Sequence, residues 1–258
     1  MAIYFPPSLM EFEPRWQVFS TWTEHMPFGY DLIGAARPRT LVELGVYRGL
    51  SYFTFCQSVQ AHRLKTQCHA VDTWEGDKHT DSYGEEVWED VSAHNEAHYS
   101  GFSQLMRMTF EAALPQFEDK SIDLIHLDGM HTYEAVKADF GNWYPKLRPG
   151  GLFLFHDIRA RLQDFGVWRF WDELEQEHET FAFDQGYGLG VLRKPGGRRK
   201  HDRPLLRLLF HPDWSERKRL KDFYAHVARH AELRRKRERQ VRLREKQRPD
   251  SRAAGGKG

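Results

Sequence analysis

Short apolar stretches alternate with longer amphipathic stretches along the first 195 residues of the chain. Strands are predicted at LVELGV (41–46), CHAVDTW (68–74), QLMRMTF (104–110), SIDLIHLDG (121–129) and GLFLFHDI (151–158). Stretches between them, such as SYFTFCQSVQAH and TYEAVKADFGNWYPKL, have helical spacing. Strands separated by helices form parallel βαβ units, and the strands lack polar alternation because helices cover both faces. The pattern predicts an α/β fold with a mostly parallel, Rossmann-like sheet.

After these units the pattern changes twice. TFAFDQ and GLGVLRK flank Gly186 and Gly188 and predict a C-terminal antiparallel hairpin. From Trp214 to about residue 247 the chain has neither Gly nor Pro, which predicts one long helix, with Asp213 as its capping residue. We therefore divide the chain into an N-terminal lead-in (1–38), an α/β domain (39–195) and a basic helical tail (196–258). We expect the tail to end in disorder at SRAAGGKG.

Charge is distributed unevenly between these segments. Residues 196–258 contain 21 Lys and Arg against 8 Asp and Glu, a net charge of +13, whereas the rest of the chain carries −12. Such a tail could bind an anionic membrane surface, a nucleic acid or an acidic partner. It could also lie on the acidic domain of a neighbouring subunit in a homo-oligomer. Aromatic residues are absent beyond Tyr224, which argues against stacking on single-stranded nucleic acid.

Several protein classes are disfavoured by composition. The chain has no apolar run of about 18 residues, so we expect no membrane span. Its N-terminus lacks a basic region followed by an apolar stretch, so we expect no signal peptide. Cys56 and Cys68 form no CxxC pair, which argues against a disulfide framework or a structural zinc site. The expectation is a cytoplasmic protein, which the tail could bring to the periphery of a membrane.

The first predicted strand runs into a glycine-containing turn with the pattern ExGxxxGxS, formed by Glu43, Gly45, Gly49 and Ser51. A side chain at these glycines would block the approach of a ligand to the backbone, and the following helix N-terminus offers N–H groups to a carboxylate. Asp72 ends the second strand, where an acid can accept hydrogen bonds from both ribose hydroxyls. These signals predict a nucleotide cofactor, either S-adenosylmethionine or NAD, although the spacing departs from the GxGxxG of nicotinamide enzymes.

The ends of the fourth and fifth strands carry acids and imidazoles. HLDGMH supplies His126, Asp128 and His131, and FHDI supplies His156 and Asp157. Because the carboxyl ends of parallel strands lie at one sheet edge, we expect Asp128 and Asp157 to converge there, with His131 and His156 beside them. Two carboxylates suit Mg²⁺ or Mn²⁺, which could lower the pKa of a substrate hydroxyl while a histidine removes its proton.

The same residues carry a family resemblance. The stretch IDLIHLDGMHTYEAVKADFGNWYPKLRPGGLFLFHDI resembles the class I S-adenosylmethionine-dependent methyltransferases typified by the macrocin and rhamnosyl O-methyltransferases and the cephamycin-biosynthesis methyltransferase. With ELGVYRGLS and HAVDTWEGD, the resemblance covers about residues 40–195. It implies a seven-stranded sheet, S-adenosyl-L-methionine as the methyl donor, and a hydroxyl of a sugar, glycan or small natural product as the acceptor.

Residue roles follow from this resemblance. It places Glu43, Gly45, Gly49 and Ser51 in the cofactor loop, Asp72 at the ribose and Phe110 near the adenine, and we expect Asp128 beside the cofactor as well. It makes Asp128 and Asp157 metal ligands and His131 the leading base, with His156 as a second candidate. His126 is expected to be structural because it points to the opposite face of its strand. Some metal-dependent relatives have two acids where this chain has His156 and Asp157.

Two other functions compete with a metal-assisted O-methyltransferase. The chain could be a non-catalytic scaffold that uses its basic tail for contacts. It could also be a nucleic-acid methyltransferase guided by the tail, although it lacks an Asn/Asp-Pro-Pro-Tyr motif. Binding of S-adenosylhomocysteine would separate the enzyme from the scaffold.

Overall fold

The computed structural model describes residues 6–76, 83–197 and 203–246. The predicted disordered end at SRAAGGKG lies outside these residues. Seven strands form one sheet in the order β3-β2-β1-β4-β5-β7-β6. They are β1 (Thr40–Leu44), β2 (Gln67–Asp72), β3 (Ser103–Arg107), β4 (Ile122–Leu127), β5 (Leu147–His156), β6 (Glu179–Phe183) and β7 (Leu189–Arg193).

Strands β1 to β5 pair in parallel, and β7 enters antiparallel between β5 and β6. The predicted α/β class, the seven-stranded sheet and the closing hairpin are therefore confirmed. The helices between successive strands from β1 to β6 are α3 (Leu50–Ala61), α4 (Glu85–His98), α5 (Phe110–Ala113), η2 (Leu114–Gln116), α6 (Tyr133–Trp143) and α7 (Val167–Glu177). Threonine hydroxyls that accept backbone N–H groups begin α5 at Thr109 and α6 at Thr132.

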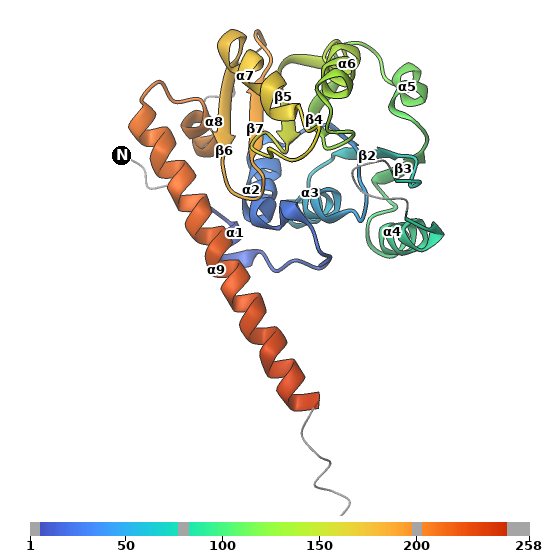
Figure 1. Ribbon diagram of the computed structural model, residues 1–258, viewed down its shortest axis with the longest axis vertical. Coiled ribbons are helices and arrows are strands. Elements are labelled where there is room, and N and C mark those ends of the chain that lie inside the picture. The colour runs from blue at the N-terminus through green and yellow to red at the C-terminus, as the bar shows by residue number, and fades with distance from the viewer. Residues whose placement is uncertain (1–5, 77–82, 198–202, 247–258) are drawn as a thin grey trace, which may run out of the picture.

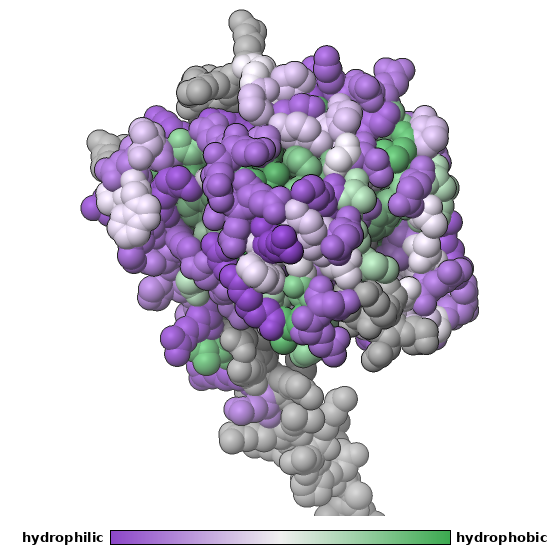
Figure 2. Space-filling view, turned by 45° about the horizontal axis from the view of Figure 1, so that its top comes forward, coloured by the Kyte–Doolittle hydropathy of each residue, from purple (hydrophilic) through white to green (hydrophobic). Residues whose placement is uncertain are grey.

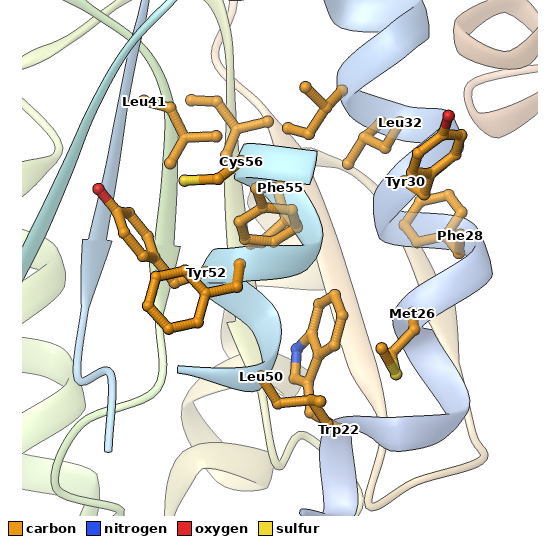
Figure 3. Packing of buried hydrophobic residues seen from close by; sticks show 14 of the residues in the cluster. Trp22, Met26, Phe28, Tyr30, Leu32, Leu41, Leu50, Tyr52, Phe55 and Cys56 are labelled. Atoms are coloured by element: carbon orange, nitrogen blue, oxygen red, sulfur yellow. The ribbon is translucent and has the colours of Figure 1, made fainter. Parts of the chain in front are cut away.

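Helices cover both faces of the sheet, as Figure 1 shows. One core cluster joins α6 and α7 to one face through residues such as Trp143, Phe170 and Trp171. The other joins the remaining face to α3 and to the N-terminal α2 (Met26–Ala36), and Figure 3 shows the side chains between these two helices. This two-sided burial explains why the strands are apolar along their whole length.

The two ends of the chain belong to the same core. The lead-in contains α1 (Ser8–Glu11) and the short 3₁₀ helix η1 (Thr21–His25), and its Trp22 and Phe28 are buried. The tail begins with α8 (Pro204–Leu209) and continues into α9 (Trp214–Lys246). Leu205 and Leu209 of α8 lie in the cluster beneath α2. The boundaries predicted at 38/39 and 195/196 therefore do not coincide with a break in the core.

A buried carboxylate joins the two termini. Asp31 of α2 accepts hydrogen bonds from the Ser8 backbone N–H (2.8 Å), the Ser8 hydroxyl (2.5 Å) and the Tyr224 hydroxyl (2.9 Å) of α9. Burial raises the pKa of Asp31 to about 6, against the lowering effect of these bonds.

The long helix α9 has two parts. Its first turns pack on the domain through Leu220, Tyr224 and Ala228, whereas its far end extends away from the globule in Figure 1. Within the described residues, no helix combines the length and the apolar composition needed to cross a bilayer.

Candidate functional site

The glycine turn after β1 lies directly against the end of β4. Gly45 has φ +85°, and a Cβ atom there would come within 2.1 Å of the Asp128 carbonyl oxygen. Gly49, with φ +75°, precedes the first residue of α3. Glycine is therefore required at 45 by backbone packing, and this contact holds the turn beside Asp128.

Asp72, at the end of β2, fastens the same turn. Its Oδ2 accepts the backbone N–H groups of Val46 (2.7 Å) and Tyr47 (2.9 Å), and its Oδ1 accepts that of Trp74 (2.8 Å). The predicted ribose-binding acid thus lies at the turn, where it organises the backbone. Trp74 is buried and donates from Nε1 to the Tyr47 carbonyl (3.0 Å), so it packs under the turn and does not face a ligand.

Glu43 and Ser51 face inward. The Ser51 hydroxyl donates to Glu43 Oε1 (2.5 Å), and His126 Nδ1 lies 3.3 Å from Glu43 Oε2. Trp22 of η1 donates from Nε1 to His126 Nε2 (3.2 Å), so His126 is an acceptor at that nitrogen. Burial raises the pKa of Glu43. This buried chain of contacts supports the turn from below, and it gives His126 the structural role expected of it.

Phe110 opens α5 beside the same sheet edge. Its ring lies where a Cβ atom on Gly129 would come within 2.6 Å of it, so it covers the backbone just after Asp128. The structure therefore places Phe110 next to the predicted cofactor loop and the end of β4.

The acids and imidazoles after β4 and β5 meet, so the predicted convergence of Asp128 and Asp157 is confirmed. His131 Nε2 lies 2.8 Å from Asp157 Oδ2 and 3.6 Å from Asp128 Oδ1. His156 Nδ1 lies 3.2 Å from the same oxygen of each acid. Asp157 adopts φ +60°, a left-handed conformation that turns its carboxylate into this cluster.

The second nitrogen of His156 is also engaged. Its Nε2 lies 2.9 Å from the carbonyl oxygen of Gly186, in the β6–β7 turn, and His25 Nε2 lies 3.2 Å from the same oxygen. His156 is only 3% exposed. Both nitrogens of His156 therefore have partners within the protein, and the contacts of Nδ1 help to hold the two carboxylates in place. Its expected role as a base stays a prediction.

Burial and charge act in opposite directions on these histidines. Burial would lower the pKa of His156, but the charges of Asp128 and Asp157 outweigh it and raise that pKa well above its usual range. For His131 the same carboxylates overcome burial and raise the pKa to about 9. In contrast, burial and the nearby His156 lower the pKa of His25 to about 3, so His25 is neutral.

A divalent cation fits this cluster. Asp128, His131 and Asp157 each offer one ligand atom, and these atoms lie within 4.8 Å of one another. The two carboxylates supply the oxygen ligands that Mg²⁺ and Mn²⁺ prefer. The His131 imidazole lies beside them, 2.8 Å from Asp157 and 3.6 Å from Asp128.

Sequence reasoning missed the supporting residues Trp22, His25, Phe165 and Gly186. The Phe165 ring stacks on His131 with a centroid distance of 4.4 Å and an interplanar angle of 5°. His25 and Trp22 come from the lead-in, which carries no motif. Gly186 acts through its backbone carbonyl, and no residue type signals such a contact.

Part of the chain matches a model of a known protein family. Residues 42–158 match the model of a methyltransferase domain family. This segment runs from β1 to the residue after Asp157, so it contains the glycine turn and the whole acid and histidine cluster.

A curated relative matches more closely in sequence but is itself uncharacterised. The protein y4gI of Sinorhizobium fredii is 52% identical over 173 residues, which is 67% of this chain and 19% of that protein. The chain therefore spans about a fifth of the length of the curated relative it matches.

Solved methyltransferases share the fold at low identity. They include an S-adenosylhomocysteine-bound methyltransferase, PaMTH1, of Podospora anserina (14% identical, 67% of this chain and 78% of that one, TM-score 0.52). The O-methyltransferase TomG of Streptomyces achromogenes, in complex with S-adenosylmethionine, is also similar (14%, 71% and 83%, TM-score 0.50). So is an O-methyltransferase of Bacillus cereus bound to S-adenosylhomocysteine (15%, 70% and 84%, TM-score 0.50). These likenesses establish the fold of the sheet and its helices.

Proposed function

We propose that this protein is an O-methyltransferase that moves the methyl group of S-adenosylmethionine to a hydroxyl of a small molecule or glycan, assisted by Mg²⁺ or Mn²⁺. One observation carries the proposal. The glycine turn and the acid and histidine cluster abut, since a Cβ atom on Gly45 would strike the Asp128 carbonyl. A cofactor on the turn and a hydroxyl at the cluster would therefore be neighbours, as methyl transfer requires.

The chain's residues divide the work. Gly45, Gly49 and Asp72 shape the turn that receives the cofactor, and the N-terminus of α3 offers N–H groups to its carboxylate. Asp128 and Asp157 are the residues that would hold the cation, which when bound lowers the pKa of the acceptor hydroxyl. His131 is aligned by Asp157 and by the stacked Phe165 ring. A cation held by the two carboxylates would offset the charges that raise the pKa of His131, and the neutral imidazole would then accept the proton released from that hydroxyl.

Methyl transfer forms one bond to the methyl carbon and breaks another. The acceptor oxygen forms a bond to the methyl carbon, the bond from that carbon to sulfur breaks, and the sulfonium becomes the thioether of S-adenosylhomocysteine. The acceptor proton moves to His131, and the imidazolium that forms is stabilised by the carboxylate of Asp157.

Calorimetry with the full chain tests the proposal. We expect S-adenosylhomocysteine to bind, and Mn²⁺ to bind with a stoichiometry of about one that Asp157→Asn abolishes. Asp172→Asn, which changes an exposed acid on α7, is the matched control and should bind Mn²⁺ normally. If the wild-type chain did not bind S-adenosylhomocysteine, the proposed enzyme function would be refuted and a non-catalytic scaffold would be favoured.

The basic tail keeps its predicted roles as proposals. Binding to anionic vesicles, to nucleic acid or to a second copy should be lost when residues 234–258 are deleted, whereas binding of S-adenosylhomocysteine should remain. Electrostatic binding of this kind would also weaken with salt.

A further inference from the structure

Large hydrophobic side chains are rarely exposed in the described part of this chain. Seven are more than a third exposed: Leu9, Phe19, Met130, Leu162, Tyr187, Trp214 and Leu233. Four of them, Phe19, Met130, Leu162 and Tyr187, belong to segments that meet at the acid and histidine cluster. The surface is otherwise mostly hydrophilic, with separate hydrophobic patches, as Figure 2 shows for one face.

Met130 and Leu162 flank His131. Met130 is 40% exposed and directly precedes His131 in the chain. Leu162 is 45% exposed, and its carbonyl accepts the N–H of Phe165, whose ring stacks on His131. The Gly166 N–H donates to the His131 carbonyl (2.7 Å), so this loop is fastened to His131 at two points.

Tyr187 lies in the β6–β7 turn, beside the contact to His156. It is 44% exposed and follows Gly186, whose carbonyl holds His156. The Tyr187 carbonyl accepts the N–H of Arg159 (2.8 Å), two residues beyond Asp157. Tyr187 adopts φ +64° between Gly186 and Gly188, so its backbone is part of the tight turn that joins β6 to β7.

Phe19 projects from a strap across the sheet edge. Before it, Trp16 Nε1 donates to the Arg48 carbonyl (2.7 Å) in the glycine turn. After it, the Thr21 carbonyl lies where a Cβ atom on Gly186 would come within 2.7 Å. The segment from Trp16 to Thr21 thus runs from the glycine turn to the β6–β7 turn, and Phe19 within it is 93% exposed.

Two cations in the segments after Asp157 have partners within the protein. Arg159 donates to Asp184 (2.9 Å), and the Arg161 guanidinium lies 3.6 Å from the centroid of the Trp168 ring. These two cations are therefore engaged within the protein, so they do not favour an anionic acceptor such as a nucleotide sugar.

We propose that Phe19, Met130, Leu162 and Tyr187 form the mouth of the acceptor site, and that the acceptor carries its hydroxyl on a flat apolar body rather than on a free sugar. The inference rests on the proposed function, since it names the acceptor class of that same site. Exposed apolar side chains grouped around a polar cluster are the usual make-up of a ligand site, where apolar walls bind and a few polar groups orient.

Binding of two probes tests the proposal with the full chain, S-adenosylhomocysteine and Mn²⁺ present. The probes are 2,3-dihydroxynaphthalene and methyl α-D-glucopyranoside, measured by calorimetry. We expect the naphthalenediol to bind and the glucoside to bind at least tenfold more weakly. Leu162→Ala and Phe19→Ala should each weaken binding of the diol by about tenfold, because each removes apolar contact area.

Matched controls come from exposed hydrophobic residues elsewhere. Leu9 is 46% exposed, almost the same as Leu162, and Trp214 is 70% exposed. Leu9→Ala and Trp214→Ala should leave binding of the diol unchanged. Circular dichroism and binding of S-adenosylhomocysteine confirm that each variant is folded.

Three results would overturn the inference. They are binding of the glucoside at least as tight as that of the diol, equal effects of the mouth and control variants, and a shift of Leu162→Ala and Phe19→Ala from dimer to monomer in sedimentation. The last would assign this surface to a second copy of the chain. If the diol bound but S-adenosylhomocysteine did not, the apolar site would be supported and the proposed methyltransferase function would be refuted.

Discussion

Replacing Gly45 by alanine should damage the site through the backbone. The new Cβ would lie 2.1 Å from the Asp128 carbonyl oxygen and 2.8 Å from the Gly129 nitrogen, and neither is a flexible side-chain end. The left-handed conformation at φ +85° costs about 1–2 kcal/mol for alanine, and overpacking of this kind adds about 1–3 kcal/mol. The free energy of unfolding should therefore fall by roughly 2–5 kcal/mol.

The same change should reach function, because relief of the clash must move the glycine turn away from Asp128. A displacement of about 1 Å in a reacting group is enough to reduce a rate by about a hundredfold. We expect the melting temperature to fall by roughly 4–20 °C in differential scanning calorimetry. Binding of S-adenosylhomocysteine should weaken at least tenfold in titration calorimetry.

Gly141→Ala is the matched control. Gly141 lies within α6, and a Cβ atom there meets nothing within 4 Å, so alanine should stabilise the helix by about 0.5–1 kcal/mol. If Gly45→Ala melts and binds like the wild type, the contact between the turn and the end of β4 does not exist as described.

Three further changes probe the framework. Trp22→Phe leaves the buried Nε2 of His126 without its donor and should lower the free energy of unfolding by about 2–4 kcal/mol in urea. Trp214→Phe, at an exposed position, is the control, and an equal effect of the two variants would contradict the buried hydrogen bond between Trp22 and His126. The pKa of Asp31 is higher in the folded protein than in the unfolded chain, so its protonation adds about 3 kcal/mol to the free energy of unfolding below pH 4. This contribution is lost as the pH rises to about 6. Asp31→Asn should therefore flatten that part of the pH profile of stability, measured by urea unfolding. A chain that ends at residue 197 should have a much lower melting temperature than one that ends at 233, because the first loses α8 and α9 and exposes the core that they cover. Equal melting temperatures would show that the tail does not contribute to the core.

The sequence predicted the sheet and the acid cluster for one physical reason. Parallel strands bring their carboxyl ends to one edge, so residues that finish apolar stretches, such as Asp128 and Asp157, can be expected to meet although they are 29 positions apart. Glycine at 45 could be anticipated in the same way, from its place between a strand and a helix.

The side-chain partners could not be predicted, because they depend on pairing that no local pattern encodes. Glu43 looks like a ligand-binding residue in its motif, but register places it directly opposite His126 on the buried face. His126 in turn meets Trp22, 104 positions away, and His25 meets the Gly186 carbonyl, 161 positions away. Both residues come from the lead-in, and their contacts with the site are long-range, so no local pattern indicates them.

Two sets of residues around this sheet edge differ in what a substitution can change. Trp22, His126 and Glu43 bond one another in the interior, so loss of one leaves a buried polar atom unsatisfied and lowers stability. Phe19 and Leu162 are exposed, and changes at such positions usually alter stability by less than about 0.5 kcal/mol. The mouth can therefore be altered while the turn and the carboxylates stay in place, which would let one fold accept different hydroxyls without rebuilding its chemistry.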